Sequence, residues 1–343
     1  MSISCSSLIA AAALALPVAA IALPAATQAP LAPKVMVITM FAPEAAPWRA
    51  AEDFTTEIAV PGLSPQYPKV SCTAAGLCLM TTDMGLANAA SSVGALVQSG
   101  RFDLRNTYLL IAGIGGVDPD DGTLGSAHWA RYAIDGGLLH MIDPRQQPAG
   151  WSSNLLMLGA KAPGEKSAWK TGTELFQLDE ALLQKAYALS ANVPLEDSDA
   201  AKAYRLQYPQ AAGHGAPKVS ICDTLTSDTY WHGTRIAQAM QAYVSLTTDG
   251  RGNYCTTQME DNASLTALKR GADAGLLQFG RIALLRTASN FDREAPGQDV
   301  GTSLSTKSGG FLPSTHNAYR VGHALAADIL QHWDAWSSGV PKD

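Results

Sequence analysis

The chain is poor in charged and aromatic residues and has no long apolar run after residue 30. Charged residues make up 16% and aromatic residues 7% of its 343 residues, and the formal net charge is -6. No block of like charges is present, which argues against a nucleic-acid-binding protein. No stretch after residue 30 approaches the roughly 18 to 20 apolar residues of a membrane span, so the mature protein is predicted to be soluble.

The sequence also lacks the short motifs of common cofactor and metal sites. The stretch Gly113-Ile114-Gly115-Gly116 is not a GxGxxG fingerprint and lacks the lysine of a phosphate-binding P-loop. No CxxC pair or paired-histidine spacing accompanies the cysteines, which disfavours zinc. We therefore predict no cofactor and no metal.

Residues 1–30 form a segment of their own. An apolar run from Leu8 to Leu23 is followed by small residues at Ala25, Thr27 and Ala29, which are typical of a signal-peptide cleavage site. No lysine or arginine precedes the apolar run, so an uncleaved N-terminal anchor is the alternative. The favoured interpretation is a signal peptide whose cleavage leaves a periplasmic or secreted protein.

The cysteine count agrees with export. Cys5 lies in the leader, and four cysteines remain after it. An even number in an exported chain indicates disulfides, and four cysteines allow three pairings. We favour Cys72 with Cys78, which would close a hairpin loop, and Cys222 with Cys255, although the sequence leaves the pairing open.

Alternating apolar segments and helical patterns predict an α/β protein with a parallel sheet. The expected strands are 34–40, 70–80 (a hairpin), 108–112, 126–135, 219–225 and 280–287. The helices with clear patterns are 47–54, 87–98, 179–191, 234–244, 261–271 and 317–333. Glycine turns are expected at 85 and at 113–116, and a mobile loop at 296–310. Residues 31–343 are interpreted as one domain with a decorated middle at about 141–215.

Polar residues follow several of these apolar strands. Because parallel strands end at one edge of a sheet, we expect these side chains to form one pocket for a polar ligand with a flat ring. The candidates are Glu44, Asp83, Asn88, Asp228, Tyr230, Trp231, His232, Met259, Glu260, Asn290 and Asp292, together with Gly113, Gly115 and Gly116, whose backbone a ligand can approach closely.

The order of these motifs resembles the purine nucleoside permease family and, more distantly, the nucleoside phosphorylase and nucleosidase superfamily. The motifs are Glu44 after the first strand, TDMGLAN at 82–88, GIGG at 113–116, SDTYW at 227–231, ME at 259–260 and RTASN at 286–290. The resemblance implies a three-layer αβα sandwich with a mixed central sheet, a role in nucleoside transport, a purine nucleoside as ligand, and a homo-oligomer.

The resemblance also implies a role for individual residues. Glu260 resembles the carboxylate that accepts hydrogen bonds from the ribose hydroxyls, with Met259 under the sugar, and Tyr230 or Trp231 resembles the aromatic that stacks on the base. Asn290 stands where nucleosidases carry an acid for the departing purine. Asp292 is the alternative acid.

Glu44 matches the glutamate that activates water in nucleosidases. Phosphorylases instead bind phosphate near the glycine turn, with an arginine and a serine where this chain has Leu110 and Gly113. The pattern therefore favours hydrolysis of the N-ribosyl bond over phosphorolysis. Two alternatives stay open: a phosphorylase that uses Arg49, Arg131 or Arg286, and a non-enzymatic nucleoside-binding component that serves an unidentified membrane transporter.

Overall fold

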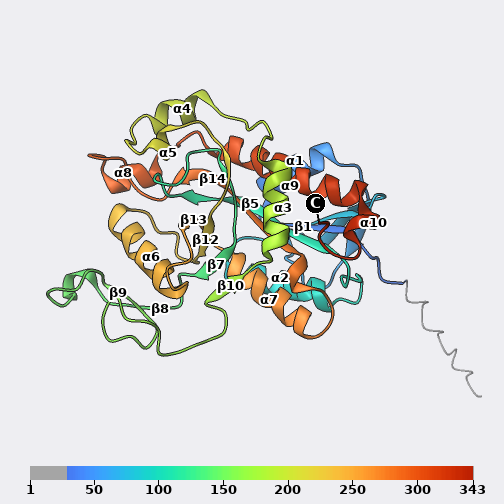
Figure 1. Ribbon diagram of the computed structural model, residues 1–343, viewed down its shortest axis with the longest axis horizontal. Coiled ribbons are helices and arrows are strands. Elements are labelled where there is room, and N and C mark those ends of the chain that lie inside the picture. Colours follow the sequence, from blue (N-terminus) through green and yellow to red (C-terminus); the bar gives the residue numbers. More distant parts are fainter. Residues whose placement is uncertain (1–28, 343) are drawn as a thin grey trace, which may run out of the picture.

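The computed structural model describes residues 29–342, and within them one 12-stranded mixed sheet runs through the molecule (Figure 1). The leader predicted for residues 1–30 lies outside the described residues except for positions 29 and 30. The strands of this sheet are β1 (Val35–Thr39), β2 (Phe54–Ala59), β3 (Lys69–Thr73), β4 (Leu77–Thr81), β5 (Tyr108–Val117), β6 (Ala127–Trp129), β7 (Tyr132–Asp135), β10 (Leu175–Gln177), β11 (Val219–Ile221), β12 (Asp223–Thr226), β13 (Tyr254–Gln258) and β14 (Ile282–Phe291).

Four parallel strands in the order β4, β1, β5 and β14 form the centre of the sheet. Their residues are almost continuously apolar and buried, as expected for parallel strands covered on both faces. At its far end β5 pairs antiparallel with β13, which makes the sheet mixed. The carboxyl ends of β1, β5 and β14 therefore open at the junction with β13.

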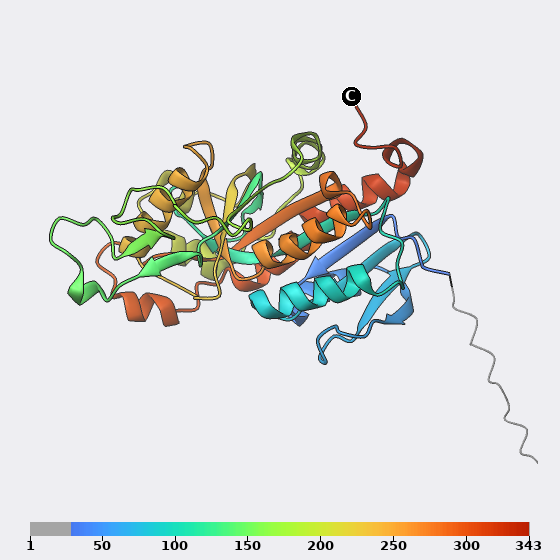
Figure 2. The same cartoon turned by 90° about the horizontal axis from the view of Figure 1, so that it is seen from below.

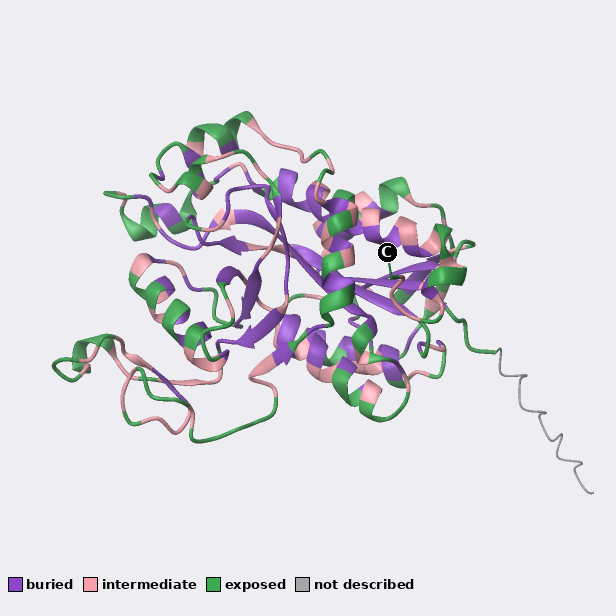
Figure 3. Ribbon diagram, viewed as in Figure 1, coloured by how far each residue is buried: buried purple, intermediate pink, exposed green. Residues whose placement is uncertain are grey.

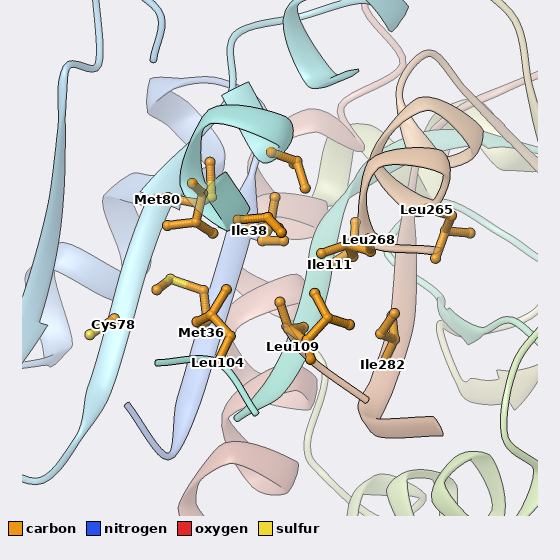
Figure 4. Packing of buried hydrophobic residues seen from close by; sticks show 14 of the residues in the cluster. Met36, Ile38, Cys78, Met80, Leu104, Leu109, Ile111, Leu265, Leu268 and Ile282 are labelled. Atoms are coloured by element: carbon orange, nitrogen blue, oxygen red, sulfur yellow. The ribbon is translucent and has the colours of Figure 1, made fainter. Parts of the chain in front are cut away.

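Helices cover both faces of the central strands (Figure 2). On one face α2 (Leu86–Gln98) and α7 (Asp261–Asp273) pack over Met36, Ile38, Leu109 and Ile111 (Figure 4). On the other face α1 (Ala42–Ala51), α3 (Glu180–Ser190) and α9 (Phe311–Gln331) pack over the residues that alternate with them in the same strands. The predicted three-layer αβα sandwich is confirmed.

The remaining elements extend the sheet beyond this sandwich. Helix α6 (Thr234–Thr247) packs against β12, β13 and β7, and the separate hairpin of β8 (Leu139–Met141) and β9 (Leu155–Met157) projects beside it. Much of this projecting segment is exposed, whereas the central strands are buried (Figure 3). The short helices are η1 (Pro144–Gln146), α4 (Asp199–Arg205), α5 (Ala211–His214), η2 (Phe279–Arg281), α8 (Val300–Ser305) and α10 (Trp333–Trp336).

The prediction of a glycine turn at 113–116 was wrong, because β5 continues through these residues to Val117. A Cβ at Gly115 would lie 2.4 Å from the carbonyl oxygen of Thr257, and one at Gly116 would lie 2.6 Å from its Oγ1. Glycine is needed here because β13 approaches closely, and none of the three glycines has a positive φ.

Other boundaries also differ from the prediction. Helix α1 begins at Ala42, so Glu44 lies in its first turn, and Pro47 sits inside the helix instead of opening it. Strands β2 and β13 were not predicted. The strand predicted at 126–135 is divided into β6 and β7, that at 219–225 is divided into β11 and β12, and the loop expected at 296–310 contains α8, which Asp299 caps.

Both favoured disulfides are present. Cys72 is bonded to Cys78 across the β3–β4 hairpin, and Cys222 is bonded to Cys255, which joins the start of β12 to β13. Among residues 29–342, no helix has the length and apolar character needed to cross a membrane.

Candidate functional site

A cavity of about 200 Å³ opens at the carboxyl ends of β1, β5 and β14, beside the end of β13. In α/β sheets this is the edge at which ligands bind. The residues that line it are Met40, Phe41, Glu44, Met84, Ile114, Gly115, Gly116, Ser227, Thr229, Tyr230, Trp231, Thr257, Gln258, Met259, Glu260, Arg286, Ser289 and Asn290. Segments far apart in the sequence thus converge on one pocket, as the motif order predicted.

Glu44 is the buried carboxylate at the inner end of the cavity. Its Oε2 accepts the amide N–H of Met40 at 2.7 Å, and its Oε1 accepts the amide N–H of Ile114 at 2.7 Å. Burial raises the pKa of Glu44 to about 7, although Arg286 and the two amides oppose this shift. A carboxylate with a pKa near neutrality is suited to act as a general base, because it is both available and basic.

Gly113 makes room for this carboxylate. A Cβ at Gly113 would lie 2.0 Å from Cε of Met40, 2.6 Å from Oε1 of Glu44 and 2.8 Å from Nη1 of Arg286. Gly113 is buried behind the lining residues and does not itself line the cavity. A serine at this position, as phosphorylases have, would have to displace at least one of these groups. Glu44 can therefore take its present position because residue 113 is glycine.

Arg286 of β14 is the buried cation of the site, 1% exposed. Its Nη1 donates to the carbonyl oxygen of Ile114 at 2.9 Å, and its Nη2 donates to Oε2 of Glu260 at 3.3 Å. Its Nε lies 3.2 and 3.1 Å from the two carboxylate oxygens of Asp261, to which Nη2 also donates. Most of its hydrogen-bonding capacity is therefore used within the protein.

Glu260 follows β13 in the chain and lines the same cavity as Glu44. Its carboxylate accepts hydrogen bonds from three donors. Oε1 accepts the amide N–H of Gly85 at 3.1 Å, and Oε2 accepts the amide of Met259 at 3.2 Å and Arg286 at 3.3 Å. Each carboxylate oxygen has more than one acceptor direction, so Glu260 can still accept hydrogen bonds from a diol. Gly85, in the turn before α2, thus helps to position Glu260.

Aromatic and amide side chains form the outer wall. Tyr230 is 58% exposed at the mouth, whereas Trp231 is buried and tilts against Tyr254 with ring centroids 6.1 Å apart. Asn290 uses its Oδ1 to accept the hydroxyl of Ser289 at 2.8 Å and its Nδ2 to donate to a backbone carbonyl at 3.0 Å. One N–H of this amide is left for a ligand.

Three of the predicted residues stabilise the turn around Gly85 and do not line the cavity. Asp83, with a φ of 72°, accepts the hydroxyl of Ser64 at 3.0 Å. Asn88 donates to the carbonyl oxygen of Met84 at 2.8 Å, and Asp228 accepts the amide of Leu86 at 2.7 Å, at the start of α2. They support the loop that presents Gly85 to Glu260.

His232 and Asp292 also lie outside this cavity. His232 bonds Oγ of Ser303 at 2.9 Å and borders a larger groove between α6 and the β8–β9 hairpin. Asp292 is enclosed: Oδ1 accepts Nε of Arg293 at 2.7 Å and Oδ2 accepts the hydroxyl of Tyr254 at 2.6 Å. Asp292 follows the last residue of β14, and its contacts with Arg293 and Tyr254 hold its side chain outside the cavity that Asn290 lines.

Asp261 was not predicted as a site residue, and Arg286 was predicted only as one of three possible cations. Of the other two, Arg131 pairs with Glu180 and Arg49 donates to Ser71, and neither lines the cavity. Two signals were present: Arg286 directly follows four apolar residues of a strand, and Asp261 directly follows Glu260. A charged residue in a buried strand requires a partner, and Asp261 is that partner.

Comparison with solved structures identifies the fold. The structure resembles the 5′-methylthioadenosine/S-adenosylhomocysteine nucleosidase of Neisseria meningitidis with a TM-score of 0.52 and 13% identity, covering 85% of this chain and 97% of that one. It also resembles futalosine hydrolase of Helicobacter pylori with a TM-score of 0.53 and 12% identity, covering 86% and 98%. The chain has the fold of the nucleoside phosphorylase and nucleosidase superfamily.

Comparison of sequences identifies the family. The family described as purine nucleoside permease matches residues 32–341. A probable purine nucleoside permease of Schizosaccharomyces pombe is 38% identical over 325 residues, covering 89% of this chain and 91% of that protein. A purine nucleoside permease of Candida albicans is 37% identical over 308 residues, covering 88% and 76%. The chain belongs to the purine nucleoside permease family.

Proposed function

We propose that this protein binds purine nucleosides and hydrolyses their N-ribosyl bond to free base and ribose. The observation that carries the proposal is the position of Glu44. Its carboxylate accepts the amide N–H of Ile114, at the strand end where a phosphate would be expected to bind, and its pKa is raised to about 7. The protein's own carboxylate thus stands in the place of an anionic substrate and can activate water.

The charge of the cavity supports water over phosphate as the attacking group. Glu44 and Glu260 both line it, and Asp261 lies directly behind, while Arg286 is the cation among the lining residues. A phosphate dianion would enter against an excess of negative charge. Phosphate sites instead rely on cationic and amide donors that are free to bind, and here the donors of Arg286 and Ile114 are already engaged.

The proposed mechanism assigns one step to each lining group. Glu260 accepts hydrogen bonds from the ribose diol, and Tyr230 covers the base at the mouth. As the bond between C1′ and the base nitrogen breaks, its electron pair moves to the base and the sugar acquires oxocarbenium character. Water attacks C1′ and gives a proton to Glu44. The departing base takes a proton from solvent while Asn290 donates a hydrogen bond to it, and Glu44 then releases its proton to solvent.

Two proteins with the same fold are named for hydrolytic activity, which supports the proposal. They are the nucleosidase of Neisseria meningitidis, 13% identical, and futalosine hydrolase of Helicobacter pylori, 12% identical. The family name favours a second candidate, a nucleoside-binding component of transport without turnover. We also infer export after leader cleavage from the two disulfides, and a homo-oligomer from the resemblance.

The test is to incubate the purified protein with inosine or adenosine in phosphate-free buffer and to measure the free base by chromatography. Release of base and ribose without phosphate supports the proposal. Release that requires phosphate would replace it with phosphorolysis. Nucleoside binding without release in either buffer would replace it with the binding component of a transport system.

A further inference from the structure

Asp261 is the most deeply buried acid next to the cavity, and neither the proposed mechanism nor the family motif gives it a role. It begins α7 directly after Glu260, and its side chain is 0% exposed. Both of its carboxylate oxygens face the guanidinium of Arg286, with Nε 3.2 Å from Oδ1 and 3.1 Å from Oδ2. Nη2 of Arg286 donates to Oδ1 as well, so the contact is made along one edge of the guanidinium.

We propose that Asp261 is a positioning residue that holds the Arg286 guanidinium beside Glu260 and away from Glu44. The proposal rests on the function assigned to Glu44 above. It concerns a residue that touches neither the cavity nor a substrate and that acts through Arg286. Its consequence is that Glu44 remains free to take a proton from water.

Arg286 has three carboxylates close to it but forms ion pairs with only two of them. It forms ion pairs with Asp261 and, at 3.3 Å, with Glu260, while among residues 29–342 no ion pair joins it to Glu44. Oε1 of Glu44 and Nη1 of Arg286 nevertheless both lie against the space above Gly113, 2.6 and 2.8 Å from the position of a Cβ. A modest rotation of an unrestrained guanidinium would bring it onto Glu44.

Burial makes the choice of partner strongly dependent on Asp261. A guanidinium that is 1% exposed must be paired, because an unpaired buried charge is very costly. If Asp261 loses its charge, Arg286 is left with Glu260 and turns toward the next carboxylate, Glu44. A direct ion pair favours the ionised form of an acid and lowers its pKa by about 1 to 3 units.

Among the described residues 29–342, the charged groups that act on Glu44 are Arg286 and Glu260. Arg286 faces it from β14, and Glu260 from the end of β13. The turn after β1 and strand β5 contribute the uncharged amides of Met40 and Ile114. At present burial dominates and the pKa of Glu44 is about 7. The position of Arg286 is thus the adjustable part of this environment.

The experiment follows Glu44 in the absence of substrate. The protein is labelled at the side-chain carboxyl carbons of glutamate, the Glu44 signal is identified by its loss in Glu44→Gln, and its titration midpoint is measured by carbon NMR. In Asp261→Asn we expect the midpoint to fall by about 1 unit or more. Asp261→Glu, which keeps the charge, should restore most of the wild-type value.

The matched control is Asp118→Asn. Asp118 is also a buried aspartate paired with a buried arginine, Arg293, but that pair lies outside the cavity, so the Glu44 midpoint should stay unchanged. Asp261→Ser carries the same prediction as Asp261→Asn if the asparagine variant does not fold, and thermal unfolding checks both. An unshifted Glu44 midpoint in folded Asp261→Asn or Asp261→Ser overturns the proposal.

The pH dependence of nucleoside hydrolysis then separates this proposal from the proposed function. If both hold, the acid limb of kcat/KM moves to lower pH in Asp261→Asn together with the Glu44 midpoint. If the midpoint moves and the limb does not, Asp261 still positions Arg286, but Glu44 is not the base. If neither moves in a folded variant, the positioning role is excluded whatever reaction the site performs.

Discussion

Within residues 29–342, two buried arginines each pair with more than one carboxylate, and the two clusters differ in access. Arg286 and Glu260 border the site cavity and, with Asp261, form the open cluster. Arg293, just after β14, borders a separate cavity, but its partners Asp118 and Asp292 line neither cavity, and Tyr254 donates to Asp292; these residues form the closed cluster. Burial raises the pKa of Glu44 to about 7 in the first cluster and that of Asp292 to about 6 in the second. A raised carboxyl pKa therefore does not identify a catalytic group unless a substrate can reach it.

The largest expected effect comes from Glu44→Gln, which tests the open cluster. Turnover should fall by about 1,000-fold, because a positioned general base contributes roughly 100- to 10,000-fold. Inosine affinity, measured by calorimetry, should be largely retained. The NH2 group of the glutamine would face the N–H of Met40 or Ile114, and two donors cannot form a hydrogen bond with each other. Thermal unfolding is therefore measured in parallel. Unchanged turnover in a folded variant would remove Glu44 as the base.

The pH dependence is the second test of the comparison. A base must be unprotonated, so activity is lost as the pH falls through the pKa of Glu44, which is about 7. Below that value kcat/KM should fall about tenfold per pH unit, and above it kcat/KM should level off. An acid limb near 6 that disappears in Asp292→Asn would assign the reaction to the closed cluster instead.

Glu260→Ala should have a smaller effect, on nucleoside binding. Hydrogen bonds to a charged group are worth about 1.5 to 3 kcal/mol, so the affinity for inosine should fall by roughly 10- to 100-fold. Hypoxanthine, which has no ribose, should bind as before. Glu260→Gln keeps the side-chain size and serves as the control for packing. An equal loss for inosine and hypoxanthine would argue against a contact with the sugar.

Asp292→Asn should have the smallest effect on activity. It weakens the pair with Arg293 and should lower the free energy of unfolding by about 1 to 3 kcal/mol, measured by urea denaturation. Because Asp292 does not line the cavity, kcat/KM per folded molecule should match the wild type. A large loss of kcat/KM with unchanged stability would mean that the two clusters do not differ as described.

The sequence was sufficient for the features that depend on local patterns. Apolar runs predicted β1, β4 and the central part of β5, and the short spacing of Cys72 and Cys78 favoured their disulfide over the other pairings that the sequence left open. The order of the motifs placed Glu44, Glu260 and Asn290 around one pocket. Neighbouring residues in the chain carry the information for the strands and the hairpin disulfide, whereas the pocket follows from the order of the motifs and the family resemblance.

The features that the sequence did not reveal depend on contacts between distant segments. Gly113 to Gly116 have the composition of a turn, but they lie in strand β5. Glycine is needed at 115 and 116 because β13 leaves no room for a side chain there. Asp261 and Arg286 are 25 positions apart, so nothing local indicates that they pair. Asp292 is only two positions from Asn290, but it pairs with Arg293 and accepts a hydrogen bond from Tyr254, which is distant in the chain, and it does not line the cavity.

The central claim, that Glu44 directs water and not phosphate to the sugar, is tested most directly by identifying the sugar product in the presence of saturating phosphate. Inosine is incubated with the protein, and phosphorus and proton NMR follow ribose 1-phosphate and free ribose. The account predicts free ribose, formed at a rate that does not depend on phosphate. Ribose 1-phosphate as the product would contradict it.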